Sequence, residues 1–212
     1  MELKGKKIDF LGDSITKGVG TSCEACRFSE IIAREQGLAA FRNYGIGGTC
    51  IACQTTVPDG VSDGNFCARA LGMDPDADIV VVFGGSNDFG YCDAPLGTAD
   101  DRTRYTFYGA CHELMRSLME RYPTSTVVIV TPTHRLGDDK PNAHGAALAV
   151  YVDILRETAR YYSLPVLDLF AVSGIQPEVE TSRQTYMPDG VHPNDAGHRL
   201  LAERMAAFLR AL

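Results

Sequence analysis

The chain has 212 residues, which is enough to bury a sizeable hydrophobic core without disulfides or a structural metal. Its 45% hydrophobic and 22% charged residues exclude a disordered or collagen-like chain. The net charge of −7 argues against a surface for nucleic acid, which needs clustered basic residues, and no apolar run approaches the ~18 residues of a membrane helix.

Short apolar runs alternate with segments of helical periodicity along the chain. Residues 8–11 form the first expected strand, and a helix capped by Ser29 follows it. Further strands are expected at 39–43, 79–83, 127–130 and 164–169. Helical stripes lie near 66–71, over 111–122, from a first turn at Pro141 to Leu155, and from an Asn194 cap to Leu212.

This order of strand and helix predicts an α/β fold with a five-stranded parallel sheet and helices on both faces. We find no internal repeat or linker, so a single domain over residues 1–212 is expected. In such sheets ligands bind outside the carboxyl ends of the strands. The residues that directly follow the strands are therefore the candidates for chemistry.

A serine, a histidine and an aspartate at these places have the types that nucleophilic catalysis needs. Ser14 follows the first expected strand, and His192 precedes the last helix. A serine hydroxyl needs a base to take its proton, and the base needs an orienting partner. Asp189, three residues before His192, can accept from the imidazole Nδ1–H through a local turn. The candidate catalytic residues are Ser14, Asp189 and His192.

Attack of a serine on an ester carbonyl creates an oxyanion, which needs fixed hydrogen-bond donors. The backbone N–H of Ser14, the backbone N–H of Gly48 and the side-chain amide of Asn87 are suitable donors. A glycine lets the backbone approach closely, and an amide supplies two N–H groups without a charge. These three groups form the candidate oxyanion hole.

The four blocks that carry these residues resemble the SGNH (GDSL-type) hydrolase family. They are Gly12-Asp13-Ser14, the loop 43–48 with Gly48, the loop 85–88 with Asn87, and the segment 189–193 with His192. The blocks stand in the family's order and span nearly the whole chain. The resemblance implies a flavodoxin-like three-layer α/β/α sandwich and hydrolysis of esters without a metal or other cofactor.

The resemblance and the residues together predict a serine hydrolase that cleaves carboxylic esters through an acyl-enzyme. The expected partner is a small-molecule ester, without nucleic acid and without membrane insertion. No lid-like apolar insertion is visible, which favours a short acyl group or an acetyl group on a carbohydrate. Two alternatives remain: an acyl hydrolase of lysophospholipase or thioesterase type, and a non-catalytic flavodoxin-like module that binds phosphate or zinc.

Other side chains near the expected strand ends have weaker assignments. His134 and Arg135 follow the fourth strand and are candidate substrate contacts. Asp13 and Asp88 are expected to brace their loops through hydrogen bonds to backbone groups. His198 is expected to have a solvated or packing role in the last helix.

The cysteines give the zinc alternative its basis. Seven cysteines are present, and without an apolar leader at the N-terminus we expect reduced thiols and a cytoplasmic location. Cys23 with Cys26 and Cys50 with Cys53 form two C-x-x-C pairs, which could together build a tetrahedral zinc site. Cys67, Cys92 and Cys111 are expected to be small packing residues.

Overall fold

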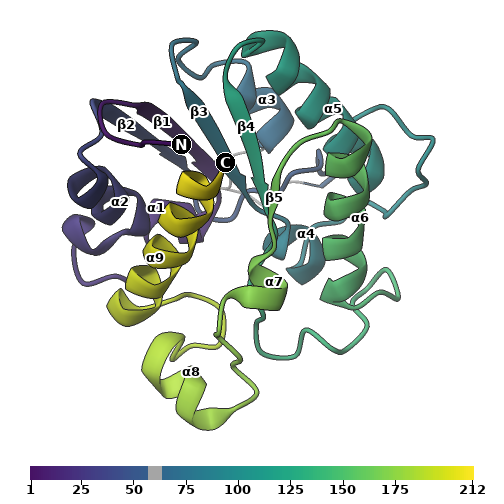
Figure 1. Ribbon diagram of the computed structural model, residues 1–212. Coiled ribbons are helices and arrows are strands. Elements are labelled where there is room, and N and C mark those ends of the chain that lie inside the picture. Colours follow the sequence, from purple (N-terminus) through teal and green to yellow (C-terminus); the bar gives the residue numbers. More distant parts are fainter. Residues whose placement is uncertain (57–63) are drawn as a thin grey trace.

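Five parallel strands form one central sheet with helices on both of its faces in the computed structural model (Figure 1). The structure describes residues 1–56 and 64–212. Along the sheet the strands follow the order β2-β1-β3-β4-β5, and all neighbouring pairs are parallel. The predicted α/β/α sandwich is confirmed. The strands are β1 (Lys7–Gly12), β2 (Ala40–Gly45), β3 (Ile79–Phe83), β4 (Thr126–Val130) and β5 (Val166–Leu167).

The helices that cover the sheet divide between its two faces (Figure 1). On one face lie α2 (Phe28–Gln36) and α9 (Asp195–Ala211), and on the other lie α3 (Phe66–Ala70), α5 (Phe107–Arg121) and α6 (Leu148–Tyr161). The connections hold short helices, which are α1 (Ser14–Lys17), the 3-10 turn η1 (Glu24–Cys26), α4 (Ser86–Gly90), α7 (Leu169–Val172) and α8 (Glu180–Tyr186).

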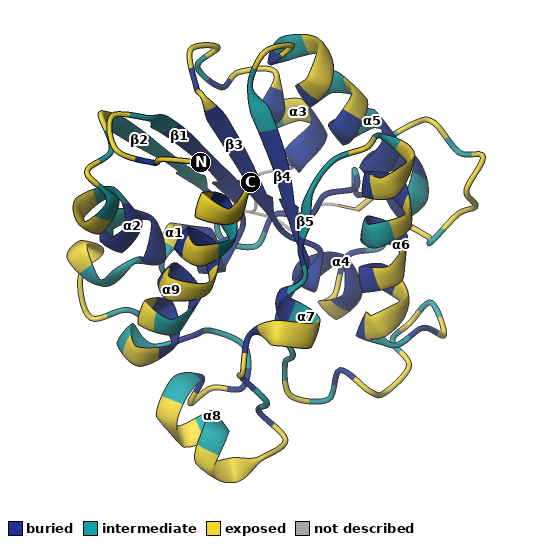
Figure 2. Cartoon of the chain, viewed as in Figure 1, coloured by how far each residue is buried: buried dark blue, intermediate teal, exposed yellow. Residues whose placement is uncertain are grey.

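Side chains of the central strand β3 alternate between two hydrophobic cores. Ile79, Val81 and Phe83 pack with α2 and α9, whereas Val80 and Val82 pack with α3, α5 and α6. Figure 2 shows the buried strands β1, β3 and β4 between helices whose outer faces are exposed. A strand that is covered on both faces has no polar side, which explains its uninterrupted apolar sequence.

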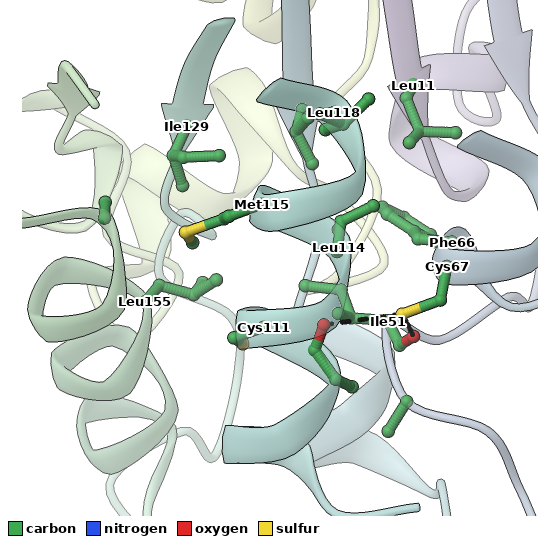
Figure 3. Close-up of a cluster of buried hydrophobic side chains, with 14 of the residues drawn as sticks. Leu11, Ile51, Phe66, Cys67, Cys111, Leu114, Met115, Leu118, Ile129 and Leu155 are labelled. Carbon is green, nitrogen blue, oxygen red and sulfur yellow. Dashed lines mark hydrogen bonds between the residues drawn. The ribbon is translucent and has the colours of Figure 1, made fainter. Parts of the chain in front are cut away.

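The core beneath α5 contains two of the predicted packing cysteines (Figure 3). Cys67 and Cys111 are both buried among apolar side chains, as predicted. Met119 falls within the predicted helical stripe over 111–122, but it is 41% exposed. Each helical residue turns the side-chain direction by about 100°, so the position after Leu118 already faces outward.

Two predicted helix starts are wrong and one is confirmed. Ser29 lies inside the first turn of α2, and its hydroxyl instead accepts from the amide of Asn43 (3.0 Å). Pro141 lies in an irregular segment before α6, which begins only at Leu148. Asn194 does cap α9, because its side chain accepts the N–H of Gly197 (3.0 Å).

The strand order places a topological switch beside β1. The chain passes from β1 to β2 on one side and then crosses to β3 on the other. Crevices outside the carboxyl ends of strands at such a point are where α/β sheets bind ligands. Within the described ranges, no helix is both long and apolar enough to cross a membrane.

Cys50 and Cys92 form a disulfide whose Cα atoms lie 6.7 Å apart. The expectation of fully reduced thiols is therefore wrong for this pair, although Cys92 is buried, as its expected packing role requires. The two residues follow β2 and α4, respectively, and are 42 positions apart in sequence. Their proximity depends on the folded arrangement of two loops, which spacing along the chain does not reveal.

Loss of this disulfide should lower the free energy of unfolding by about 4 kcal/mol, the chain-entropy value for a loop of this length. Urea unfolding of a Cys50→Ala/Cys92→Ala variant measures the effect. The control is Cys23→Ala/Cys26→Ala, whose thiols lie outside the core and are not bonded in a disulfide. Equal stability of the two double variants would contradict the prediction.

His198 packs in the core between α9 and α2, as one of its two predicted roles required. It is fully buried (0% exposed), its Nδ1 accepts the N–H of Phe28 (3.2 Å), and its ring stacks on the Phe28 ring. Burial lowers the pKa of His198 to about 4. Because the folded-state pKa lies below the ordinary value, the stabilisation is complete above about pH 6.5 and is lost as the pH falls towards 4.

The pH dependence of unfolding should therefore change when His198 is replaced. The difference between the pKa of His198 in the folded protein, about 4, and its ordinary value of about 6.5 corresponds to about 3 kcal/mol. The wild type should lose roughly this amount relative to His198→Leu between pH 7 and pH 4. Urea unfolding at each pH measures the difference, in which the titrations of carboxylates shared by both proteins cancel. A wild-type-minus-variant difference that is constant with pH would refute the expectation.

Candidate active site

Ser14, His192 and Asp189 form one hydrogen-bonded chain in the structure. Ser14 Oγ lies 3.0 Å from His192 Nε2, and His192 Nδ1 lies 2.7 Å from Asp189 Oδ2. A carboxylate can only accept, so Nδ1 carries the hydrogen and Nε2 presents its lone pair to the serine hydroxyl. The fold thus joins residues that are 178 positions apart in sequence.

The turn after β1 sets the position of Ser14. The Asp13 side chain accepts the N–H of Ile15 (2.9 Å) and caps α1, so Ser14 becomes the first helical residue. Gly12 is needed for this tight turn, because a Cβ there would lie only 1.9 Å from Thr16 Oγ1. The first N–H groups of a helix have no acceptor within the helix, so the Ser14 N–H is available to a ligand.

The loop between α8 and α9 orients the imidazole through Asp189. Asp189 Oδ1 accepts the backbone N–H of Val191 (2.8 Å) and of His192 (2.7 Å), while Oδ2 is bonded to the ring. Partial burial raises the pKa of Asp189, but these hydrogen bonds outweigh it, and the net pKa lies below the ordinary value. The carboxylate therefore stays ionised at neutral pH.

Gly48 follows β2 and Asn87 follows β3, and their two loops meet beside Ser14. A Cβ on the neighbouring Gly47 would lie 3.8 Å from Ser14 Cβ, which places this loop against the serine. Gly48 has φ +78°, a conformation that glycine adopts without strain. The Asn87 side chain is buried, and its Nδ2 donates to the carbonyl of Thr49 (3.0 Å). That bond uses one amide N–H and leaves the second available.

Asp13 and Asp88 brace loops, as predicted. Asp13 caps α1, and the two oxygens of Asp88 accept the N–H groups of Ile51 (3.0 Å) and Ala52 (2.9 Å). Burial raises the pKa of both carboxyl groups to about 6. Both point their hydrogen-bonded oxygens at backbone groups, which fits a structural role.

His134 and Arg135 are placed differently from each other. The His134 ring bonds Asp138 (2.7 Å) and packs on Phe170, and neither contact involves Ser14 or His192. Arg135 donates to the carbonyl of Ser86 (3.0 Å), and its guanidinium lies over the ring of Phe89. Arg135 therefore contacts α4, the helix that carries Asn87, whereas His134 lines a hollow with Phe170 and Ile175.

Sequence reasoning missed Arg69 as a residue that supports the site. Its guanidinium donates to the carbonyls of Gly12 (3.0 Å) and Tyr44 (2.5 Å) and to the hydroxyl of Thr49 (2.8 Å). Burial lowers the pKa of Arg69 to about 10, so the side chain remains charged at neutral pH. These hydrogen bonds connect the ends of β1 and β2 with the loop of Gly48. No local sequence pattern indicates that role.

Tyr91 was missed as well. Its hydroxyl donates to the carbonyl of Gly48. Tyr91 directly follows α4 as its C-cap, and its backbone is not helical. No sequence pattern indicates its contact with Gly48.

The four-thiolate zinc site is not formed. Cys50 is bonded to Cys92 and cannot serve as a thiolate ligand, while Cys23 and Cys26 lie together with sulfurs 3.2 Å apart. Across residues 1–56 and 64–212, no cluster of three or more His, Cys, Asp or Glu side chains could hold a metal ion. The zinc-binding alternative, as a site made from both pairs, is wrong.

A family model described as GDSL-like Lipase/Acylhydrolase matches residues 10–200. The chain belongs to this family. The matched range contains Ser14, Gly48, Asn87 and His192, so the family that the four sequence blocks indicated is confirmed. Membership supports an esterase- or lipase-type hydrolase.

Individual relatives agree with the family. The chain is 32% identical over 147 residues to the GDSL lipase Rv0518 of Mycobacterium tuberculosis (strain ATCC 25618 / H37Rv), a match covering 68% of this chain and 54% of that protein. The chain thus spans about half the length of this curated relative. One solved structure is 36% identical with a TM-score of 0.90 and covers 100% of this chain and 99% of its own.

A more distant structure shows the same fold. It is a two-domain esterase active on acetylated mannans, 23% identical with a TM-score of 0.65. The match covers 97% of this chain and 48% of that protein.

Proposed function

We propose that this protein is a serine esterase in which Ser14 is the nucleophile, His192 the general base and Asp189 the residue that orients and stabilises the imidazole. The observation that carries the proposal is the pair of hydrogen bonds of 3.0 Å and 2.7 Å that links the three side chains. Family membership supports ester hydrolysis by the same protein.

The reaction begins when Ser14 Oγ attacks the ester carbonyl and His192 Nε2 takes the hydroxyl proton. The ionised Asp189 stabilises the imidazolium that forms. The tetrahedral oxyanion accepts from the N–H of Ser14, the N–H of Gly48 and the free N–H of Asn87. The imidazolium then gives its proton to the leaving alcohol, which leaves an acyl group on Ser14.

Water completes the cycle on the same residues. His192 takes a proton from a water molecule as the water attacks the acyl-enzyme, and the three oxyanion donors stabilise the second tetrahedral intermediate. Proton return to Ser14 Oγ releases the carboxylic acid. No step needs a metal or another cofactor.

We infer that the acyl group is short, with an acetyl group on a carbohydrate as the preferred case. The apolar side chains on the segments next to the serine and histidine are exposed, with Ile46 at 41%, Tyr91 at 54% and Leu136 at 43%. Exposed apolar side chains can contact an acyl group of any length, so they do not decide between a short and a long chain. The preference for an acetyl group is supported instead by the fold-level likeness to an esterase of acetylated mannans.

A panel of p-nitrophenyl esters of increasing chain length tests the substrate class, followed by acetylated sugars and an acyl thioester. We expect the highest kcat/KM for acetyl or propionyl esters and release of acetate from the sugars. A maximum at long chains would favour the lysophospholipase-type alternative, and a preference for thioesters would favour a thioesterase. The single domain over 1–212, the small-molecule partner and the cytoplasmic location remain predictions.

A further inference from the structure

We propose that Tyr91 is a positioning residue for the oxyanion hole, acting through the backbone of Gly48. This inference rests on the proposed function and adds a residue that the four family blocks do not contain. The Tyr91 hydroxyl donates to the carbonyl of Gly48. It lies so close to the loop that a Cβ on Gly48 would be 3.2 Å from the phenol oxygen.

The Tyr91 contact is one of a series along two facing segments, 48–52 and 87–92. At the two residues that follow Gly48, the Asn87 amide donates to the Thr49 carbonyl (3.0 Å), and Cys50 is joined to Cys92 by the disulfide. Asp88 then accepts the N–H groups of the next two residues, Ile51 and Ala52 (3.0 and 2.9 Å). Each residue from 48 to 52 is thus held by a side chain of the second segment.

Gly48 is the member of this series at which orientation matters most. A glycine at positive φ has wide conformational freedom, so its own backbone does not fix the direction of its N–H. The carbonyl that Tyr91 holds belongs to the peptide that directly follows this N–H. By fixing that peptide, the phenol limits rotation at Gly48 and so holds the direction of its N–H, which the proposed function uses as an oxyanion donor. Preorganised donors of this kind stabilise an oxyanion without reorganisation during the reaction.

The exposed ring of Tyr91 has a second conceivable use, as a surface on which part of the substrate rests. The two roles use different parts of the side chain and affect different kinetic parameters. Positioning needs the hydroxyl and acts on the transition state, so its loss lowers kcat. A resting surface needs the ring and acts on bound substrate, so its loss raises KM.

The test compares Tyr91→Phe with wild type on p-nitrophenyl acetate. We expect kcat to fall about 10-fold, the effect of one lost hydrogen bond in the site, while KM stays within about 2-fold. Affinity for phenylboronic acid, whose boron accepts Ser14 Oγ to form a tetrahedral anion, should fall by a similar factor. Tyr105→Phe is the matched control, because Tyr105 is also an exposed tyrosine (61%) and lies outside both facing segments.

Several results would overturn the inference. An unchanged kcat in Tyr91→Phe would do so, and so would a rise in KM with kcat unaffected. Tyr91→Leu is a second variant, expected to lose at least as much kcat, and a wild-type kcat there would also contradict the role. Unfolding curves verify that each variant is folded. Activity that survives in Ser14→Ala would instead defeat the proposed function itself, so the two failures are distinguishable.

Discussion

Replacing Ser14 with Ala should lower kcat on p-nitrophenyl acetate by about 10⁴–10⁶. The variant loses the hydroxyl oxygen that forms the acyl-enzyme in the proposed mechanism, while we expect the fold around it to be retained. His192→Ala should lose a similar factor, because the hydroxyl then has no base within hydrogen-bond distance. The double variant should be little worse than either single one, since residues that act as a unit are not additive.

The control for this series is Ser117→Ala, at a half-buried serine of α5 on the helical layer beside the sheet. It should keep wild-type kcat. The assignment fails if Ser14→Ala retains turnover near the wild-type value. It also fails if the double variant shows the product of the two single losses, because independent effects would then replace a shared proton transfer.

Asn87→Ala should lower kcat by about 10²–10³, the usual effect of removing one oxyanion donor. KM should change much less, because the amide acts mainly on charge that develops in the transition state. Steady-state kinetics with p-nitrophenyl acetate separate the two parameters.

Asn142→Ala is the control for a half-buried amide that contacts α4, the helix that carries Asn87. Asn142 donates to the carbonyl of Phe89 (3.0 Å) and to the hydroxyl of Tyr151 (2.8 Å), and none of its hydrogen bonds involves Ser14 or His192. We expect this variant to lose stability but to keep kcat within about 10-fold. Equal losses of kcat in the two variants would show that Asn87 supports the fold rather than the oxyanion.

The sheet could be predicted because its signals are local. The run 79–83 is apolar throughout, and the structure buries both of its faces. Boundaries were less predictable where tertiary contacts decide. The apolar residues 164–169 suggest a full strand, yet only Val166 and Leu167 pair with β4. Leu212, expected in the buried stripe of α9, is exposed at the end of the chain.

The candidate site likewise contains some residues that the sequence predicts and others that it does not. Ser14, Gly48, Asn87 and His192 could be found because each stands in a short sequence block next to a strand end or the last helix. The groups that hold these blocks in place could not, since their contacts join distant segments. Arg69 reaches the ends of β1 and β2, and the pairing of Cys50 with Cys92 exists only once two loops have met.

The placement of candidate substrate contacts shows a further limit. His134 and Arg135 are adjacent in sequence after β4, and the same argument selected both. In the structure, the His134 side chain contacts Asp138 and Phe170. The Arg135 side chain instead contacts Ser86 and Phe89. Position after a strand predicts the region of a residue, but the direction of its side chain depends on neighbours that sequence does not specify.

Covalent labelling with an alkyl fluorophosphonate tests the central claim most directly. An activated serine displaces fluoride from phosphorus and keeps the phosphonyl group. Peptide mapping by mass spectrometry should find one label, on Ser14, in parallel with loss of esterase activity, and almost none in His192→Ala after the same time. Inactivation with the label on another residue, or full activity after Ser14 is labelled, would contradict the account.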